Sequence, residues 1–111
     1  MIDNTLTQKV LILTFNQDSF PLATGIPPEE VKLTDPKNIS KIKEIVDKQN
    51  PKLVIIDGCI EVESIVRSVV AVSAVRNRKR LDLNIYIVNQ DKLLIRGARW
   101  IQNPEDVKQY A

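Results

Sequence analysis

Short apolar runs that alternate with longer segments of helical periodicity constrain the fold of this chain more than any other feature. The runs "VLILTF", "KLVIID" and "NIYIV" are rich in β-branched residues and are too short for helices of ordinary length. Strands are therefore expected near 9–15, 31–34, 53–57, 83–89 and 99–102. Regular alternation of strands with helices predicts an α/β fold, a doubly wound sandwich around a mostly parallel sheet of about five strands.

The segments between these runs carry helix signals of unequal strength. Prolines in 16–30 leave room for a short helix only. A second helix is predicted to begin with Asp35 as its N-cap and to end near Asn50. The valine-rich segment 61–79 is predicted to be helical, because it exceeds an ordinary strand in length and has carboxylates first and arginines last.

Two weaker helices are also predicted in the last third of the chain. The segment "DKLLIRGA" has room for one or two helical turns that end at Gly97. Another helix begins near Asn103 and has only about two turns before the chain ends at Ala111. So short a final helix would cover less of the sheet than a full-length one.

Composition indicates one folded domain spanning residues 1–111. Apolar residues make up 43% of the chain and charged residues 27%, which is typical of a globular domain. The net charge of +2 indicates neither a nucleic acid nor a membrane partner by itself. No apolar run approaches the roughly 20 residues of a membrane span, and the amino terminus does not resemble a signal peptide, so a cytoplasmic location is expected.

Cysteine and histidine usage narrows the chemistry. Cys59 is the single cysteine and histidine is absent, which excludes an internal disulfide, a multi-cysteine metal site and histidine-based acid–base catalysis. No metal or other cofactor is expected. Cys59 itself is predicted to be a small buried apolar group and not a redox thiol.

Asp57 is the most informative single residue, because it ends the apolar run of 53–57 and is followed by Gly58. A carboxylate at the carboxyl end of a central strand can accept a phosphoryl group, bind a metal or cap the turn that follows. The residues around it leave these alternatives open.

The stretches "PKLVIIDG" and "GARWIQNP" resemble two parts of the receiver domain of bacterial response regulators. The first is similar to the family's third strand with its phosphoacceptor aspartate, and the second to its fifth strand with its switch aromatic residue. The resemblance covers nearly the whole chain and implies a flavodoxin-like sandwich. It also implies that Asp57 is equivalent to the phosphoacceptor and Trp100 to the switch aromatic.

The rest of the receiver site is degenerate in this sequence. The family's acidic pair falls on 14–16, and its serine or threonine falls on Val88 or Asn89. Its lysine, which precedes a proline, is replaced by Asn103. The degenerate positions are Asn16, Asp18 (the nearest carboxylate to the missing pair), Asn89 and Asn103. Because phosphoryl transfer to a carboxylate concentrates negative charge that metal-binding carboxylates and an ammonium group normally offset, we expect a pseudo-receiver without enzymatic activity.

Several functions remain as alternatives. The favoured one is a regulatory or adaptor module in signal transduction that binds another protein or a second copy of itself. A phosphorylatable single-domain response regulator with Asp57 as acceptor is the second, and nucleic-acid binding through the 76–80 arginine cluster is a less favoured third. A metal-dependent nuclease using Glu61 and Glu63 is rejected, because "IEVES" holds no lysine.

The helix predicted over 61–79 is the candidate interface. Its apolar residues cover more than the roughly 100° stripe that one sheet contact uses, so some are expected to face outward. A dimer or a tight complex with a partner is expected to form through this helix, through the short final helix, or through both. The candidate interface residues are Val69, Val72, Arg76 and Arg78. Trp100 is expected in the core.

Overall fold

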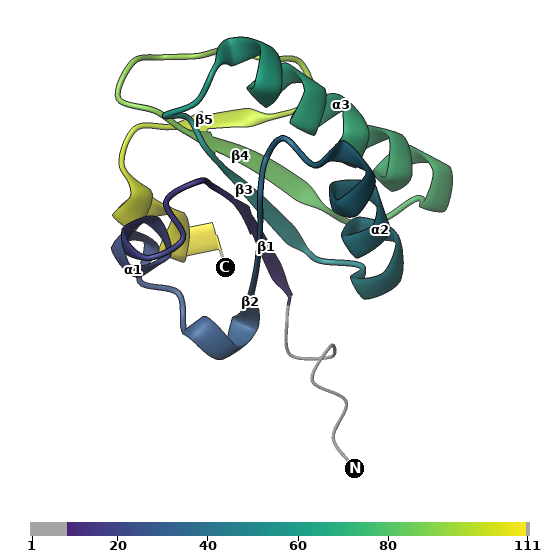
Figure 1. The fold of residues 1–111 in the computed structure, drawn as a ribbon, viewed down its shortest axis with the longest axis horizontal. Helices are drawn as coiled ribbons and strands as arrows, with labels where there is room; N and C mark the ends of the chain where they lie inside the picture. Colours follow the sequence, from purple (N-terminus) through teal and green to yellow (C-terminus); the bar gives the residue numbers. More distant parts are fainter. Residues whose placement is uncertain (1–8, 111) are drawn as a thin grey trace.

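A computed structural model describes residues 9–110 as a parallel sheet with helices on both faces (Figure 1). The strands are β1 (Val10–Leu13), β2 (Val31–Thr34), β3 (Leu53–Asp57), β4 (Asn84–Val88) and β5 (Arg99–Ile101). Their order is β2-β1-β3-β4-β5, and every neighbouring pair is parallel. This is the strand order of flavodoxin-like folds, so the predicted fold class is confirmed.

The predicted strand positions are confirmed, with shorter ends. β2 and β3 have the predicted bounds, whereas β1 spans only Val10–Leu13 of the predicted 9–15. β1 ends early because Phe15 and the residues after it are exposed and turn toward the first helix. The strand interiors are buried on both faces, as near-continuous apolar strands of a parallel sheet require.

Two long helices cover one face of the sheet. They are α2 (Ile39–Gln49) and α3 (Val62–Lys79), and they pack on the larger of the two apolar clusters (Figure 1). The helix predicted over 61–79 is therefore confirmed to within one residue. Asn50 ends α2 in the left-handed region with φ 47°, as the predicted stop at this residue implies.

Two short helices cover the opposite face. They are α1 (Ser19–Thr24) and the 3₁₀ helix η3 (Pro104–Tyr110), while a further 3₁₀ turn, η2 (Pro28–Glu30), precedes β2. α1 and η3 lie side by side over a smaller apolar cluster (Figure 1). α1 has only six residues and ends where Gly25 adopts φ 72° as its C-cap, which confirms the short helix expected in 16–30.

The predicted start of α2 is wrong by three residues. Asn38, not Asp35, is the N-cap, and its side chain accepts a hydrogen bond from the Lys41 amide at 3.1 Å. Asp35 instead accepts from the Lys37 amide at 2.7 Å, which closes a turn before the helix. An aspartate that bonds two residues ahead stabilises a turn in place of a helical start.

No helix forms within residues 91–98, so that prediction is wrong. Leu93 and Ile95 are half-buried against the core, while Leu94 and Arg96 are exposed. This period of two is that of an extended chain, and packing of alternate side chains on the sheet outweighs the weak helical preference. Gly97 ends the segment with φ 96°.

The final helix is a 3₁₀ helix and not the two α-helical turns that were predicted after Asn103. Its Val107 is fully buried, and Tyr110 stacks on Tyr86 of β4 with ring centroids 4.7 Å apart. Ala111 lies outside the described residues. Among residues 9–110, no helix is long and apolar enough to cross a membrane.

Candidate functional site at the carboxyl edge of the sheet

Asp57 and Thr14 meet at the carboxyl ends of β3 and β1. The two strands run in register with Leu13 beside Ile56, so the next residues along each strand are neighbours. The Thr14 hydroxyl donates a hydrogen bond of 2.7 Å to Asp57 Oδ2, and both side chains are buried. The pair lies where the strand order reverses, the usual place for sites in open parallel sheets.

Both oxygens of the Asp57 carboxyl group have a donor from within the chain. Oδ1 accepts from the Cys59 backbone amide at 3.0 Å, and Oδ2 accepts from Thr14. The first bond closes the turn through Gly58, which confirms the turn-capping alternative for this residue. At 5% exposure, an aspartate needs such partners to offset the loss of water.

Thr14 also links Asp57 to the first helix. Its hydroxyl oxygen accepts from the Asn16 amide at 2.9 Å while its proton goes to Asp57. The Asn16 side-chain oxygen in turn accepts from the Ser19 amide at 3.2 Å and from the Ser19 hydroxyl at 2.8 Å. Asn16 therefore holds the start of α1, and it does not present a free oxygen beside Asp57.

Gly58 is required by close contact between the ends of β3 and β4. Its amide donates to the Val88 carbonyl at 2.7 Å, and a Cβ at this position would lie 2.4 Å from that same oxygen. Any larger residue would push the two strands apart. The glycine thus keeps the turn after Asp57 tight.

One hydrogen bond joins each neighbouring pair of strands just beyond the sheet ladder. We call this row of bonds the rim. Its four bonds are Thr14 amide to Thr34 carbonyl at 3.2 Å, Thr14 hydroxyl to Asp57, Gly58 amide to Val88 carbonyl, and Asn89 amide to Ile101 carbonyl at 3.0 Å. The rim crosses all five strands without interruption.

An open cleft of about 390 Å³ lies above the rim. Of the described residues that line it, Asp57 alone carries a charged side chain. The cleft is also lined by the uncharged hydroxyl of Ser19 and by four side-chain amides, those of Asn16, Asn89, Gln90 and Gln102. The cleft therefore places no ammonium group and no second carboxylate beside Asp57.

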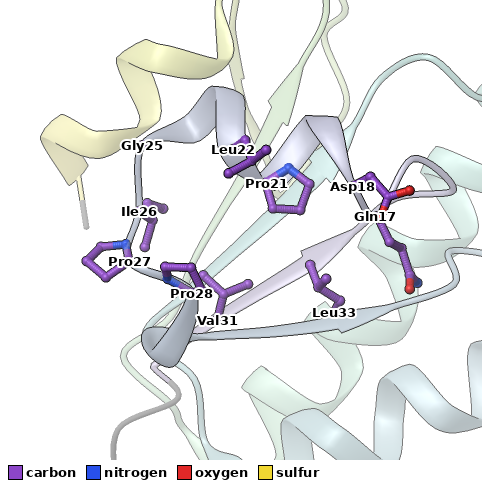
Figure 2. Close-up of a pocket in the computed structure, with 10 residues that line it drawn as sticks. All are labelled: Gln17, Asp18, Pro21, Leu22, Gly25, Ile26, Pro27, Pro28, Val31 and Leu33. Atoms are coloured by element: carbon purple, nitrogen blue, oxygen red, sulfur yellow. The ribbon is translucent and has the colours of Figure 1, made fainter.

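Asp18 lies away from Asp57, although sequence reasoning kept it as a possible member of the same site. It lines a separate pocket of about 400 Å³ between α1 and the edge strand β2, as Figure 2 shows. Leu22, Ile26 and Val31 give that pocket apolar walls. Because Asp18 precedes α1 on its exposed side, the loop after β1 does not bring it back over the sheet.

The remaining positions predicted from the resemblance to receivers, Asn89, Trp100 and Asn103, lie at or near the ends of β4 and β5. Trp100 is half-buried and not fully in the core, because its indole N–H donates to the Asn89 carbonyl at 2.9 Å. Asn89 lines the cleft with Asp57, whereas Asn103 does not. The structure therefore brings Asn16 and Asn89 to the Asp57 cleft and leaves Asp18 and Asn103 outside it.

Cys59 is exposed, so the prediction of a buried apolar cysteine is wrong. It follows the Gly58 turn and points toward the cleft, where the negative charge of Asp57 raises the pKa of its thiol. Partial burial and a thiol hydrogen bond to the same carboxylate raise the pKa further. The neutral thiol is thus favoured over the reactive thiolate.

The basic cluster at the end of α3 is largely engaged by other residues of the chain. Arg76 donates to the Leu83 carbonyl at 3.3 Å, and Arg78 pairs with Asp47 of α2 at 3.1 Å. Lys79 donates to the Asp47 carbonyl at 2.6 Å and to the Asn50 side chain at 2.9 Å. These contacts tie the ends of α2 and α3 together, which is a structural role.

Val69 and Val72 cannot form an exposed interface, so their assignment as interface residues is wrong. They are 1% and 0% exposed, because they lie on the side of α3 that packs on the sheet. The valines that face outward are Val62, Val66 and Val70. The prediction that α3 retains exposed apolar residues is thus confirmed with a different set.

Thr14 is the residue that sequence reasoning missed. It falls in the stretch 14–16, where the resemblance to receivers implies an acidic pair, and no role was predicted for it. The signal that could have revealed it is register, since β1 and β3 pair with a constant offset of 43 residues that leads from Thr14 to Asp57. A single sequence shows which strands are buried but not how they are aligned.

Glu61 and Glu63 belong to the start of α3 and not to a metal centre. Glu61 is the exposed N-cap residue, and Glu63 pairs with Arg67 one turn later at 2.6 Å. Within residues 9–110, no group of three or more Cys, Asp or Glu side chains is placed to hold a metal ion. Comparison of the chain with protein-family models, curated proteins and solved structures finds no match.

Proposed function

We propose that the chain is a non-catalytic receiver-like module, of regulatory or adaptor type, that acts in the cytoplasm by binding protein. The observation that supports this most directly is the internal use of Asp57. Both of its carboxyl oxygens accept hydrogen bonds from the chain, from Thr14 and from the Cys59 amide. A carboxylate that serves as a turn cap and strand link has a complete role without chemistry.

The surroundings of Asp57 also oppose phosphoryl transfer. The arriving phosphoryl group would add further negative charge beside Asp57, whose own side chain is buried. No lysine or arginine lines the cleft among the described residues, and the positions around Asp57 carry the neutral amides of Asn16 and Asn89. The charge that develops in transfer would therefore lack a partner from this cleft.

A phosphorylation assay tests the proposal. The full chain is incubated with acetyl phosphate and Mg²⁺, and its intact mass is measured alongside that of Asp57→Asn. We expect each protein to keep its own unmodified mass, with no added phosphoryl group in either. A phosphorylated species in the wild type that is absent from Asp57→Asn would establish the phosphorylatable regulator and overturn the proposal.

Nucleic-acid binding is less well supported, because Arg76, Arg78 and Lys79 already bind acceptors within the chain. A nucleic-acid site built on these residues would have to break the contacts that join α2 to α3. Affinity for a short DNA duplex that falls steeply between about 50 and 200 mM salt would favour this alternative over protein binding.

A further inference from the structure

The outward side of α3 carries a row of exposed apolar residues. Val62, Val66 and Val70 are 56%, 38% and 61% exposed, and Ala74 continues the row as another exposed residue. A spacing of four places them on one ridge of the helix. Figure 1 shows α3 along the outer side of the molecule. We call these four residues the α3 ridge.

Valine is a poor choice for the exposed side of a helix unless something covers it. Each exposed valine lowers helix stability by roughly half a kcal/mol relative to alanine, because its branched side chain loses rotamer freedom. Isolated exposed apolar residues are common on protein surfaces, but a contiguous row is not. The α3 ridge is therefore a candidate contact surface.

The exposed valines are spaced evenly about Val66. Val62 lies four residues before it and Val70 four residues after it. Two antiparallel copies of α3 that meet at Val66 would place Val62 of each against Val70 of the other. Ridges of residues spaced four apart pack in the commonest class of helix contacts, at a crossing angle of about 50°.

Charges beside the ridge are also complementary between two copies. Glu63 and Arg67 flank Val66 on the same side of the helix, and both are about two-thirds exposed. In the antiparallel arrangement, Glu63 of one copy and Arg67 of the other lie only about 3 Å apart along the helix direction, given a rise of 1.5 Å per residue. The ion pair within each helix can thus be exchanged for two pairs between helices.

We propose that the partner of this module is a second copy of the same chain, bound through the α3 ridge in an antiparallel arrangement with its two-fold axis at Val66. This inference rests on the proposed function and names its partner. The second copy would also cover the groove beside the ridge. Ile39 and Lys43 of α2 line this groove together with Val66 and Val70. The groove widens the contact beyond a single helix.

The affinity should be modest, because one helix pair with a shallow groove is at the small end of specific interfaces. We expect a dissociation constant on the order of micromolar, with dimer formation that depends on protein concentration. Sedimentation velocity over a concentration series from about 0.1 μM to about 100 μM brackets that value.

The first experiment replaces the residue on the axis. Val66→Glu brings two carboxylates together in the dimer and should raise the dissociation constant at least about tenfold, which corresponds to 1.4 kcal/mol. Leu22→Glu is the matched control, because Leu22 is 76% exposed on α1 at the opposite face of the sheet. This control should dimerise like the wild type, and circular dichroism should show both variants folded.

The second experiment reverses the charges one at a time. Glu63→Arg places two arginines together at each site of the dimer, and Arg67→Glu places two glutamates together, so each variant alone should be mostly monomeric. An equal mixture of the two variants restores an arginine opposite a glutamate at both sites. We expect the mixture to form a heterodimer and the doubly reversed chain to form a homodimer.

Three results would overturn this inference. They are a wild-type monomer at every concentration, a dimer that Val66→Glu leaves intact, and a mixture of the charge variants that stays monomeric while each variant is folded. None of them bears on phosphorylation at Asp57, which the mass measurement decides. The partner and the proposed function can thus fail separately.

Discussion

The two faces of the sheet are covered to very different extents. α2 and α3 supply 11 and 18 residues on one face, whereas α1 and η3 supply six and seven on the other. The thick face buries the larger apolar cluster, and its excess apolar surface lies on the far side of α3. The thin face leaves its gap next to the sheet itself, in the pocket of Figure 2. The comparison teaches that helix length decides where apolar surface remains exposed.

The largest effect expected from this comparison is on core stability. Ile65→Ala on α3 and Ile26→Ala on the thin face remove the same atoms, and substitutions of this kind cost about 2–5 kcal/mol. Ile65 is fully buried, so its removal leaves an enclosed cavity, whereas Ile26 already lines a pocket. We expect Ile65→Ala near the upper end and Ile26→Ala near the lower end, measured by urea unfolding. Equal losses would mean that the two layers are equally well packed.

Two buried threonines give a second matched comparison. Thr14 donates to the Asp57 carboxyl group, whereas Thr24 on the thin face donates to the Pro21 carbonyl at 2.6 Å. Valine has the same shape but no hydroxyl. Thr14→Val should lower the free energy of unfolding by about 1.5–3 kcal/mol and Thr24→Val by about 0.5–1.5 kcal/mol, because bonds to charged groups are stronger. A larger loss for Thr24→Val would contradict the central role given to the Thr14–Asp57 bond.

Stacking of Tyr110 on Tyr86 tests how η3 is held on the thin face. The rings lie 28° from parallel, and such pairs contribute about 0.5–1.5 kcal/mol beyond the area they bury. Tyr110→Ala should lower stability by about that amount, and Tyr110→Phe should leave it nearly unchanged, because the ring stays in place. Thermal unfolding of both variants distinguishes stacking from a role of the phenol oxygen.

The smallest predicted effect is on the rate at which the Cys59 thiol is alkylated. Asp57 raises the pKa of the Cys59 thiol, so at a given pH less thiolate is present and alkylation is slow. Asp57→Asn removes the main cause of the shift, and the pKa should fall back toward its ordinary value. We therefore expect faster labelling by iodoacetamide near pH 8 in Asp57→Asn than in the wild type. An unchanged rate in the folded variant would show that the carboxyl charge does not act on this thiol.

Much of the fold could be predicted from the sequence because the strands of a buried parallel sheet are apolar throughout. The apolar runs that form β1, β3 and β4 are too short for ordinary helices, so a buried strand is the structure that fits their length. Prediction failed where tertiary packing competed with local preference. In 91–98 the burial of alternate side chains gave an extended chain, and at α2 the turn closed by Asp35 moved the cap to Asn38.

The candidate site could be predicted only in part. Asp57 was identified because its place at a strand end is visible in the sequence, but its partner Thr14 depends on strand register. The same limit applies to α3. Its length and apolar excess were predictable, but which valines face outward depends on how the helix rotates against the sheet, so Val69 and Val72 were assigned to the wrong side.

The rim has a mechanical consequence. Each bond of the rim resists the sliding of one strand past its neighbour at one boundary of the sheet. Three of the four bonds are made by the backbone, whereas the bond between β1 and β3 is made by the side chains of Thr14 and Asp57. A side-chain substitution at Thr14 or Asp57 can therefore loosen the sheet at its central boundary, while the other three boundaries keep their bonds.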